Sequence, residues 1–590
     1  MIKPVPPAFI FILGALPIPF LMGKLKQLYL LLISVLAFID LLYLETGTGW
    51  VFHFLHYDLV FAQVDRLSLA IGYIFAIIGC LSILYSLQVK ESGQQVASFM
   101  YIGSSLGVVF AGDYFSLFVF WEIMAVTSVF LIWYRKEKEP LEAGFRYVLM
   151  HIFGGCCLLT GIILHVVSQE SITVGPLQGG WAAFFILIGF GLNTAFIPLH
   201  TWLPDAYPQG TITGSVFLSV FTTKTGVYAL ARCFSGTDFL AYIGAIMAVY
   251  GIIFALLQND TRKLLSYHII SQVGYMVAGI GIGSPLGVNG GIAHLTNNIL
   301  YKTLLFMCMG SVIYRTGKEK LTELGGLARL MPITCVTCLI ASLSISGAPG
   351  FNGFVSKGMV LSSVVEAHQP VLELMLILAS VGTFLSFTKL CYFTFFTKNE
   401  EIKAKEAPVN MQWAMMFTAF LCIFIGVYPK ALFYILPHDL GNYHSYTPSH
   451  MVGVLQLFLL SGFVFMLAYR AFSPHPWIVL DFDYFYRMIC RGILWMCKGL
   501  LNNVRLKVQA FLSQGVRSAI RLSKNPMLII EMVLRSAPVK MDRASGQLSV
   551  FSEEKGKGYD ENLYRNPMGL GVLLAILFLF LYGLIYLMKS

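Results

Sequence analysis

Apolar runs of about 20 residues, each long enough to cross the roughly 30 Å hydrocarbon core of a bilayer, recur almost without interruption from Pro7 to Phe472. About fifteen such runs can be counted by this length criterion, and one more lies at Gly569–Met588. Hydrophobic residues make up 57% of the chain and charged residues 12%, a composition far from that of soluble globular proteins. The sequence therefore predicts an all-α polytopic membrane protein with about 16 transmembrane helices.

Five ionisable side chains interrupt these apolar runs: Glu122, Lys224, His294, Lys302 and Lys357. A charge at the centre of a spanning helix costs about 2.5–3.5 kcal/mol on insertion scales, and such residues usually belong to ion or proton paths. On one run, His294, Asn298 and Lys302 are spaced by four and so share one face of a helix. The pattern favours a path for protons or ions through the membrane.

Two apolar runs contain residues that interrupt a regular helix. The stretch 181–207 carries Pro198 and the polar His200, and the stretch 333–361 carries Pro349 followed by Gly350. Irregular backbone at membrane depth survives only when it is buried in protein or lines a wet cavity. Two interrupted helices in separate parts of a chain are typical of inverted repeats, so we expect two inverted five-helix repeats.

These features divide the chain into seven predicted parts. The segment from Tyr484 to about Arg535 alternates apolar clusters with basic residues, which favours an interfacial amphipathic helix. The predicted parts are N-terminal transmembrane helices (1–110), a first half-channel repeat (111–257), a second half-channel repeat (258–400), C-terminal transmembrane helices (401–475), a lateral amphipathic helix (476–540), a polar linker (541–567) and a terminal transmembrane anchor (568–590).

Several other classes of function find no support in the sequence. The net charge of +10 lies in short loops and one late segment, so we read it as membrane orientation and expect no nucleic-acid partner. Cys335 and Cys338 form a C-x-x-C, but no second pair or nearby histidine completes a zinc site. No phosphate-binding or dinucleotide fingerprint is present. We therefore expect no metal, no cofactor and no redox centre in this chain.

The middle of the chain carries a series of motifs in order, from about Asp65 to Lys357. The motifs are FWEIM (120–124), PLHTWLPDA (198–206), TKTGVY (223–228), RKLLSY (262–267) with ISQVGY (270–275), AHL (293–295), YKTLLF (301–306), GGLARLMP (325–332) and NGFVSK (352–357). This series resembles the antiporter-like subunits of respiratory complex I and of Mrp-type cation/proton antiporters. The long form with a lateral helix resembles the complex I subunit farthest from the redox arm, whereas the motifs resemble the Mrp D subunit more.

The resemblance implies half-channels joined by a line of lysines and histidine at mid-membrane. In that scheme Glu122 modulates a lysine partner, Lys224 and Lys302 are central relay groups, His294 lies between them, and Lys357 is the terminal relay on the second broken helix. His151, Asn193, Asn298 and Lys263 are further candidates for relay or hydration. Because burial lowers the pKa of a lysine and a nearby carboxylate raises it again, movement of the carboxylate acts as a switch.

Two positions depart from the family pattern. Seven residues before His200, where the family usually has the lysine that pairs with the glutamate, this chain has Asn193. Between His294 and Lys302, where a second histidine is frequent, it has Asn298. Asparagine can orient water but cannot carry a net proton charge. If Glu122 needs a partner, Lys224 is the candidate; otherwise the coupling or the ion choice differs, or the chain is a scaffold.

Structural explanations stand beside the functional one. Glu122, Lys224 and Lys302 could form buried ion pairs that fix helix register, and Lys357 could extend to the membrane interface. His294 and His151 could be core histidines, and Lys263 precedes a run where a loop charge is expected. The functional prediction is a proton-translocating subunit, with Na⁺ exchange as an option, of a multi-subunit Mrp-type complex in the cell membrane.

Two alternatives place the same proton path elsewhere: in the membrane arm of a redox complex of the NADH or ferredoxin dehydrogenase, hydrogenase or formate hydrogenlyase type, or in an inorganic-carbon uptake complex. In every case the expected partners are other antiporter-like and small membrane subunits, the lipid bilayer, H⁺ and, as a second candidate ion, Na⁺. Any catalysis would then belong to the partners.

Overall fold

The computed structural model describes residues 5–399, 401–441, 443–475 and 479–524, together with Ile576 and Phe578. The chain separates into two compact units, Met1–Cys490 and Arg491–Ser590. The predicted linker and almost all of the predicted terminal anchor lie outside the described residues, as do 476–478 and 525–540 of the predicted lateral segment.

The first unit begins with helices and a β-hairpin. The predicted helical fold is confirmed for most of the described chain, and this hairpin is a local exception: its two strands pair antiparallel with Gly47 opposite Val64 and Phe54 opposite Tyr57. Aromatic and β-branched residues fill both strands, and such residues favour a pleated surface. These elements are α1 (Pro7–Gly14), the 3₁₀ turn η1 (Ile18–Phe20), α2 (Gly23–Leu42), β1 (Gly47–Phe54), β2 (Tyr57–Val64) and α3 (Arg66–Tyr85).

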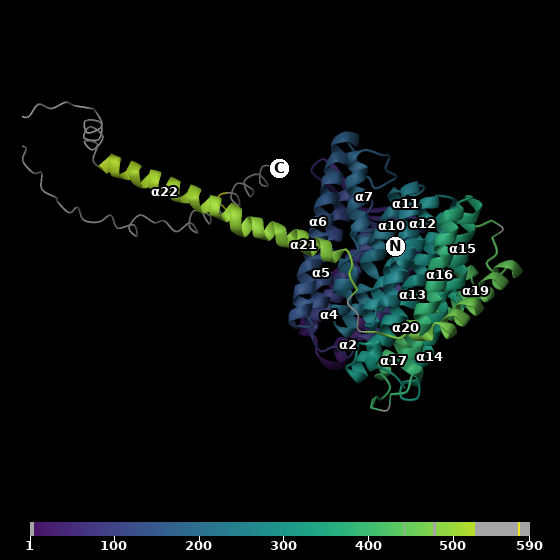
Figure 1. Cartoon of the computed structure of the whole chain (residues 1–590). Helices are drawn as coiled ribbons and strands as arrows, with labels where there is room; N and C mark the ends of the chain where they lie inside the picture. Colours follow the sequence, from purple (N-terminus) through teal and green to yellow (C-terminus); the bar gives the residue numbers. More distant parts are fainter. Residues whose placement is uncertain are drawn as a thin grey trace, which may run out of the picture. The chain divides into compact units, whose positions relative to one another are not determined.

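The next helices pack side by side and contain two interruptions (Figure 1). One lies between α7 and α8, and the other is a two-residue turn between α9 and α10. The elements are α4 (Ser92–Phe110), α5 (Tyr114–Trp133), α6 (Lys138–Gln169), α7 (Trp181–Asn193), α8 (Trp202–Ala206), the 3₁₀ turn η2 (Tyr207–Gln209), α9 (Ile212–Leu218) and α10 (Phe221–Cys233).

Glycines hold two of the following helices at close range. A Cβ built on Gly251 of α11 would lie 2.5 Å from the backbone nitrogen of Ser271 on α12, so only small residues permit this approach. The elements are α11 (Asp238–Leu257), α12 (Thr261–Ile282), α13 (Pro285–Thr316), η3 (Leu321–Glu323), α14 (Pro332–Ser346), α15 (Asn352–Glu366), α16 (Pro370–Cys391), the π-helical η4 (Tyr392–Phe396), α17 (Val409–Val427), α18 (Lys430–Phe433), α19 (Pro448–Leu467) and α20 (Tyr469–Phe472).

Nine helices in the described part of the chain are long and apolar enough to cross a membrane. The prediction of a polytopic helical membrane protein is therefore confirmed, while the count of 16 spans stays a prediction. Fewer helices meet this criterion than the sequence predicts, because the interrupted helices are too short by themselves and α13 is rich in buried polar residues. The long apolar helices are α2, α3, α5, α6, α11, α12, α16 with η4, α17 and α19.

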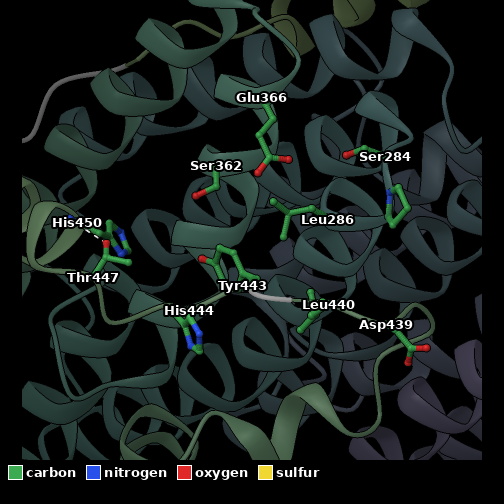
Figure 2. A pocket seen from close by; sticks show the side chains of 12 residues that line it. Ser284, Leu286, Ser362, Glu366, Asp439, Leu440, Tyr443, His444, Thr447 and His450 are labelled. Carbon is green, nitrogen blue, oxygen red and sulfur yellow. Dashed lines mark hydrogen bonds between the residues drawn. The ribbon is translucent and has the colours of Figure 1, made fainter.

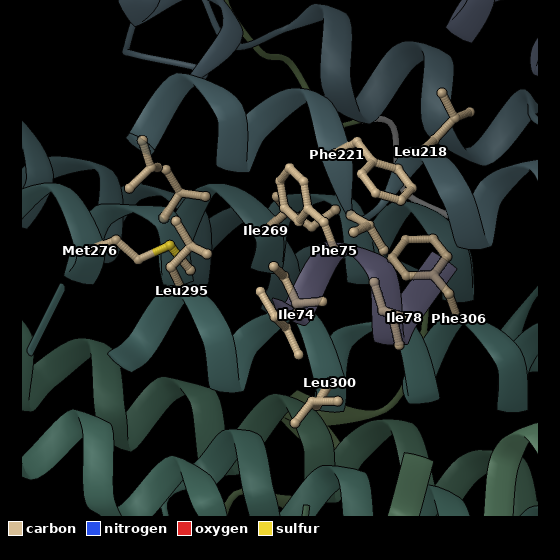
Figure 3. Packing of buried hydrophobic residues seen from close by; sticks show 14 of the residues in the cluster. Ile74, Phe75, Ile78, Leu218, Phe221, Ile269, Met276, Leu295, Leu300 and Phe306 are labelled. Carbon is tan, nitrogen blue, oxygen red and sulfur yellow. The ribbon is translucent and has the colours of Figure 1, made fainter. Parts of the chain in front are cut away.

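The apolar core runs through the middle of the first unit. Figure 3 shows Phe75 of α3 beside Phe221 of α10, and the two rings meet edge to face with centroids 5.1 Å apart. Leu295 and Leu300 of α13 belong to the same buried cluster. Burial of this surface, at roughly 25 cal/mol per Å² where water is displaced, and dispersion contacts hold the bundle around the polar groups described below.

A basic amphipathic helix leads into and forms the described part of the second unit. It comprises α21 (Asp483–Met496), a π-helical turn η5 (Cys497–Leu501) and α22 (Asn502–Lys524). Leu501, Val504, Val508 and Phe511 recur at helical spacing, and these side chains are exposed. An exposed apolar stripe at this spacing on a basic helix is typical of a membrane-surface helix.

Candidate functional site

The first interruption places a buried histidine in the connection between α7 and α8. Pro198 and His200 both lie in this connection, and the indole nitrogen of Trp202 donates a 3.0 Å hydrogen bond to the Leu192 carbonyl at the end of α7, which also accepts from the Ala195 backbone N–H. His200 is fully buried, and its Nε2 lies 3.2 Å from Oδ1 of Asp481. The interruption is thus tied to a residue just before α21.

Three side chains contact the carboxylate of Asp481. Besides His200, the hydroxyls of Tyr250 on α11 and Tyr267 on α12 donate hydrogen bonds of 2.5 Å to its two oxygens. Burial favours the neutral acid, but the contacts with His200, Tyr250 and Tyr267 outweigh it and lower the pKa of Asp481 to about 2. The sequence analysis missed Asp481, which looks like one more acid at the start of a charged segment.

The second interruption lies between α14 and α15. Gly347 and Gly350 have φ values of +87° and +89°, a backbone conformation that side chains with a Cβ rarely adopt, and Pro349 stands between them. A Cβ on Gly426 of α17 would lie only 2.3 Å from the Gly350 carbonyl oxygen. The backbone of α17 therefore packs directly against this interruption.

A third interruption, which the sequence analysis did not predict, separates α9 from α10. The Ser219 carbonyl at this turn accepts a 2.7 Å hydrogen bond from Nζ of Lys224, one turn into α10. Lys224 is fully buried. The sequence analysis names Lys224 as the candidate partner of Glu122, but the structure gives its ammonium a backbone carbonyl instead. Such a contact satisfies the amine without neutralising its charge.

Glu122 faces α6. Oε1 of Glu122 lies beside Gly155 of α6, and a Cβ built on Gly155 would lie 2.1 Å from this oxygen. Oε1 hydrogen-bonds to no protein group in the described part of the chain. His151 lies one turn before Gly155 on the same face of α6. The His151 ring centroid is 4.7 Å from that of Trp202, and the side chain lies beside Asn193. Glu122, His151 and Asn193 thus gather around α6.

Lys302 sits in an apolar setting on α13. No described protein group hydrogen-bonds to its Nζ, which lies 5.5 Å from the centre of the Phe387 ring on α16. Lys224 is close enough for the two charges to repel. The same Phe387 ring stacks near His268 of α12, with centroids 4.5 Å apart. Lys302 therefore lies between Lys224 and His268.

His268 is a buried group that the sequence analysis missed. Its Nε2 is hydrogen-bonded to the Ser386 hydroxyl on α16, while no described protein group contacts its Nδ1 by a hydrogen bond. Both Lys302 and Lys357 lie within electrostatic range of the ring. The pattern that identifies the other site residues, an ionisable side chain inside an apolar run, was present here too.

His294 and Asn298 are joined through a tyrosine instead of directly. His294 Nδ1 lies 3.1 Å from the Ser356 hydroxyl on α15, and its Nε2 lies 3.4 Å from the Tyr301 hydroxyl. The Asn298 amide donates to the same hydroxyl at 3.3 Å. Tyr301 therefore links His294 to Asn298 on the helix face that the sequence analysis assigns to His294, Asn298 and Lys302.

Lys357 lies on α15, within electrostatic range of both His268 and His294. It is 5% exposed, so its ammonium does not extend to the outside of the bundle. Its Nζ lies 5.2 Å from the centre of the Tyr275 ring and hydrogen-bonds to no described protein group. Lys263, by contrast, sits in the first turn of α12, where its backbone N–H donates to Asp260. The structure does not bring Lys263 to the lysines above.

The buried amines and imidazoles thus form a chain across α10, α13, α12 and α15, in the order Lys224, Lys302, His268, Lys357 and His294. Each consecutive pair is close enough to interact electrostatically. A series of groups that gain and lose protons can pass protons from one to the next where water bridges them.

The comparisons with known sequences match this region. The family described as NADH:quinone oxidoreductase/Mrp antiporter, TM, matches residues 111–386. An uncharacterized protein of Methanocaldococcus jannaschii is 31% identical over 388 residues, which cover 60% of this chain and 80% of the relative. Na⁺/H⁺ antiporter subunit A1 of Staphylococcus haemolyticus is 28% identical over 484 residues, which cover 71% of this chain and 60% of the relative. The chain therefore spans well under two thirds of that subunit A1. The likeness to an Mrp D subunit stays a prediction.

Solved structures share the fold. A chain of the Mrp complex from Dietzia sp. DQ12-45-1b superposes with a TM-score of 0.73 at 24% identity, covering 87% of this chain and 62% of that one. A chain of the membrane-bound sulfane sulfur reductase, an archaeal respiratory membrane complex, superposes with a TM-score of 0.69 at 23% identity, covering 90% of this chain and 99% of that one.

Proposed function

We propose, since the chain belongs to the NADH:quinone oxidoreductase/Mrp antiporter family, that it is a proton-translocating subunit of a multi-subunit Mrp-type complex in the cell membrane. Sodium is the second candidate ion. Its partners would be other antiporter-like and small membrane subunits. A relative named as a Na⁺/H⁺ antiporter subunit supports this proposal.

The observation that carries the proposal is the pair of buried lysines, Lys302 and Lys357, whose ammonium groups hydrogen-bond to no group in the described part of the chain. A buried polar group without a hydrogen bond costs about 1–3 kcal/mol, and an ionised one costs more. A fold that only needed stability would place methionine or leucine at these positions. Such expensive groups in a membrane interior are typical of a proton or ion path.

The roles follow the order of the groups. Lys224, Lys302 and Lys357 hold and pass protons, and His268 and His294 lie between or beside them. Glu122 modulates the line from the α6 side, where His151 and Asn193 arrange water, and Asn298 does the same beside Tyr301. The repeats at 111–257 and 258–400 would supply one half-channel each, and the interruptions at Pro198–His200 and Pro349–Gly350 would let water reach them.

A second candidate function is the proton-pumping membrane arm of a redox complex. The likeness to a chain of an archaeal respiratory complex covers nearly all of both chains, which favours this reading. The basic helix α21–α22 would then brace neighbouring subunits. In either case the proton path in this chain is the same, and the energy source lies in the partners.

Proton movement in everted membrane vesicles tests the proposal. The complex is expressed in a host that lacks its own antiporters, and the pH gradient is followed by fluorescence quenching with and without added Na⁺. Glu122→Ala and Lys302→Ala are expected to abolish proton movement while the protein level in the membrane stays unchanged. Unchanged movement in both variants would contradict the proposal.

Affinity purification in mild detergent separates the two candidate functions. Mass spectrometry that finds only small cation-antiporter subunits beside this chain supports the Mrp-type complex. Copurifying iron–sulfur, nickel or flavin subunits would replace it with the redox-driven pump.

A further inference from the structure

A polar surface cavity of about 710 Å³ lies near the start of α13 and the end of α15. Figure 2 shows Glu366 and Ser362 of α15 across this cavity from Tyr443 and His444, which belong to the connection before α19. Glu366 and His444 are exposed, so water reaches this space. We call it the outer cavity.

A second, much smaller cavity lies deeper in the bundle. It measures about 40 Å³ and is lined by Lys357, Gly347 and Ser346, among others. By the usual requirement of about 10–15 Å³ per water, it has room for roughly two or three molecules. We call it the inner cavity. His450, in the first turn of α19, is the one residue that lines both cavities.

The His450 ring is held in one orientation. Its Nδ1 lies 2.9 Å from the Ser445 carbonyl, and the ring stacks on Phe354 with centroids 4.3 Å apart. A carbonyl can only accept a hydrogen bond, so Nδ1 carries the proton in the neutral ring and Nε2 keeps a free lone pair. The contact therefore fixes the tautomer that can accept a proton at Nε2.

Nε2 faces the residue next to Lys357. A Cβ built on Gly358 would lie 3.1 Å from Nε2 of His450 and 3.2 Å from the Tyr443 hydroxyl, so both polar atoms converge over this glycine. Burial raises the pKa of Tyr443 to about 12; the nearby Ser445 and Ser362 side chains oppose this shift, and the Glu366 charge adds to it. The hydroxyl therefore keeps its proton near neutral pH.

We propose that His450 passes protons between Lys357 and the outer cavity, an inference that rests on the proposed function. The Lys357 ammonium releases a proton to water in the inner cavity, and Nε2 of His450 takes it up. Lys357 is then a neutral amine and His450 an imidazolium. Nε2 releases the proton to water of the outer cavity, whose ionisable groups are Glu366, Asp439, His444 and Tyr443, and His450 is again a neutral imidazole. Lys357 becomes an ammonium again when it takes up the next proton from the buried groups behind it.

Chemical rescue distinguishes proton transfer from a structural role. His450→Ala in the assembled complex is expected to lower proton flux in proteoliposomes by roughly 100-fold, the usual range for a lost proton-transfer group. Added imidazole is expected to restore much of the flux, since the outer cavity is wide enough to admit it. The matched control is His444→Ala, which removes an exposed imidazole from the same cavity and is expected to leave flux unchanged.

A second variant tests the geometry. Gly358→Ala places a methyl group 2.5 Å from Cε1 and 3.1 Å from Nε2 of His450, so that the ring must shift, and we expect the variant to lower flux in a way that imidazole does not restore. Flux in His450→Ala equal to that of the unsubstituted chain, or a loss of flux that imidazole fails to restore, would overturn the proposal. Lys302→Ala serves as the reference for the proposed function: if the unsubstituted chain conducts no better than this variant, the proposed function falls as well.

Discussion

Replacing Lys302 with methionine should stabilise the protein while it stops transport. The ammonium is fully buried and no described protein group hydrogen-bonds to it, which costs about 1–3 kcal/mol or more. The cation–π contact between this ammonium and the Phe387 ring, at 5.5 Å, offsets about 1 kcal/mol of that cost. Methionine has a similar length and adapts to the same space, so the free energy of unfolding should rise by up to about 2 kcal/mol.

Titration with SDS in mixed micelles measures the unfolding free energy, and proton flux in proteoliposomes is measured on the same preparation. Leu304→Met is the control on the same buried stretch of α13, because such a swap should cost less than about 1.5 kcal/mol and should not alter flux. If Lys302→Met is less stable than the unsubstituted chain and still conducts protons, Lys302 is a structural residue and the reasoning fails.

Three further changes test other parts of the site. Asp481→Asn should lower the free energy of unfolding by roughly 2 kcal/mol near neutral pH. The pKa of Asp481 is depressed from 3.8 to about 2, so the carboxylate contributes stability that is present above pH 4 and is lost as the pH falls towards 2. The unfolding free energies of the variant and the unsubstituted chain should therefore converge as the pH is lowered across this range. Gly155→Ala should displace the Glu122 carboxyl, which lies 2.1 Å from the new Cβ position, and should lower vesicle proton flux with little change in thermal stability. Asn193→Lys should not raise flux above that of the unsubstituted chain; a severalfold gain would mean that the chain has lost its transport function.

Gly155→Ala has a matched control variant on the same helix, and Asp481→Asn has a pH dependence that can contradict it. Gly154→Ala adds a methyl group to the neighbouring position on α6, where it meets Leu192 at 3.2 Å, and it should leave the flux unchanged. Equal flux losses in the Gly154 and Gly155 variants would assign the effect to helix packing. A stability difference between Asp481→Asn and the unsubstituted chain that persists unchanged to pH 2 would contradict the account of the Asp481 carboxylate.

Long apolar runs were enough to predict membrane helices, and the interruptions at Pro198 and Pro349 were predictable because proline fixes φ and removes a hydrogen-bond donor, while glycine allows conformations that leave the helix. The interruption at Ser219 carries neither residue, so it depends on packing and on the Lys224 contact. The hairpin before α3 was missed because a short apolar run reads alike as strand or helix.

The candidate site, too, could be predicted from the sequence only in part. Lys224, Lys302 and Lys357 stand out in the sequence because a charge in an apolar run is costly wherever it folds. The role of Asp481 depends on Tyr250 and Tyr267, which lie 231 and 214 residues away in the chain. The proposed role of His450 depends on its position between two cavities, which several helices form together. Such long-range arrangements leave no local pattern.

The most direct test of the central claim compares Lys224→Met, Lys302→Met and Lys357→Met in proteoliposomes under an imposed membrane potential. If the three lysines carry protons in series, each single variant should block flux by roughly 100-fold, and the triple variant should be no worse than any single one. Substantial flux in any one of the single variants would show that the buried line is not the route.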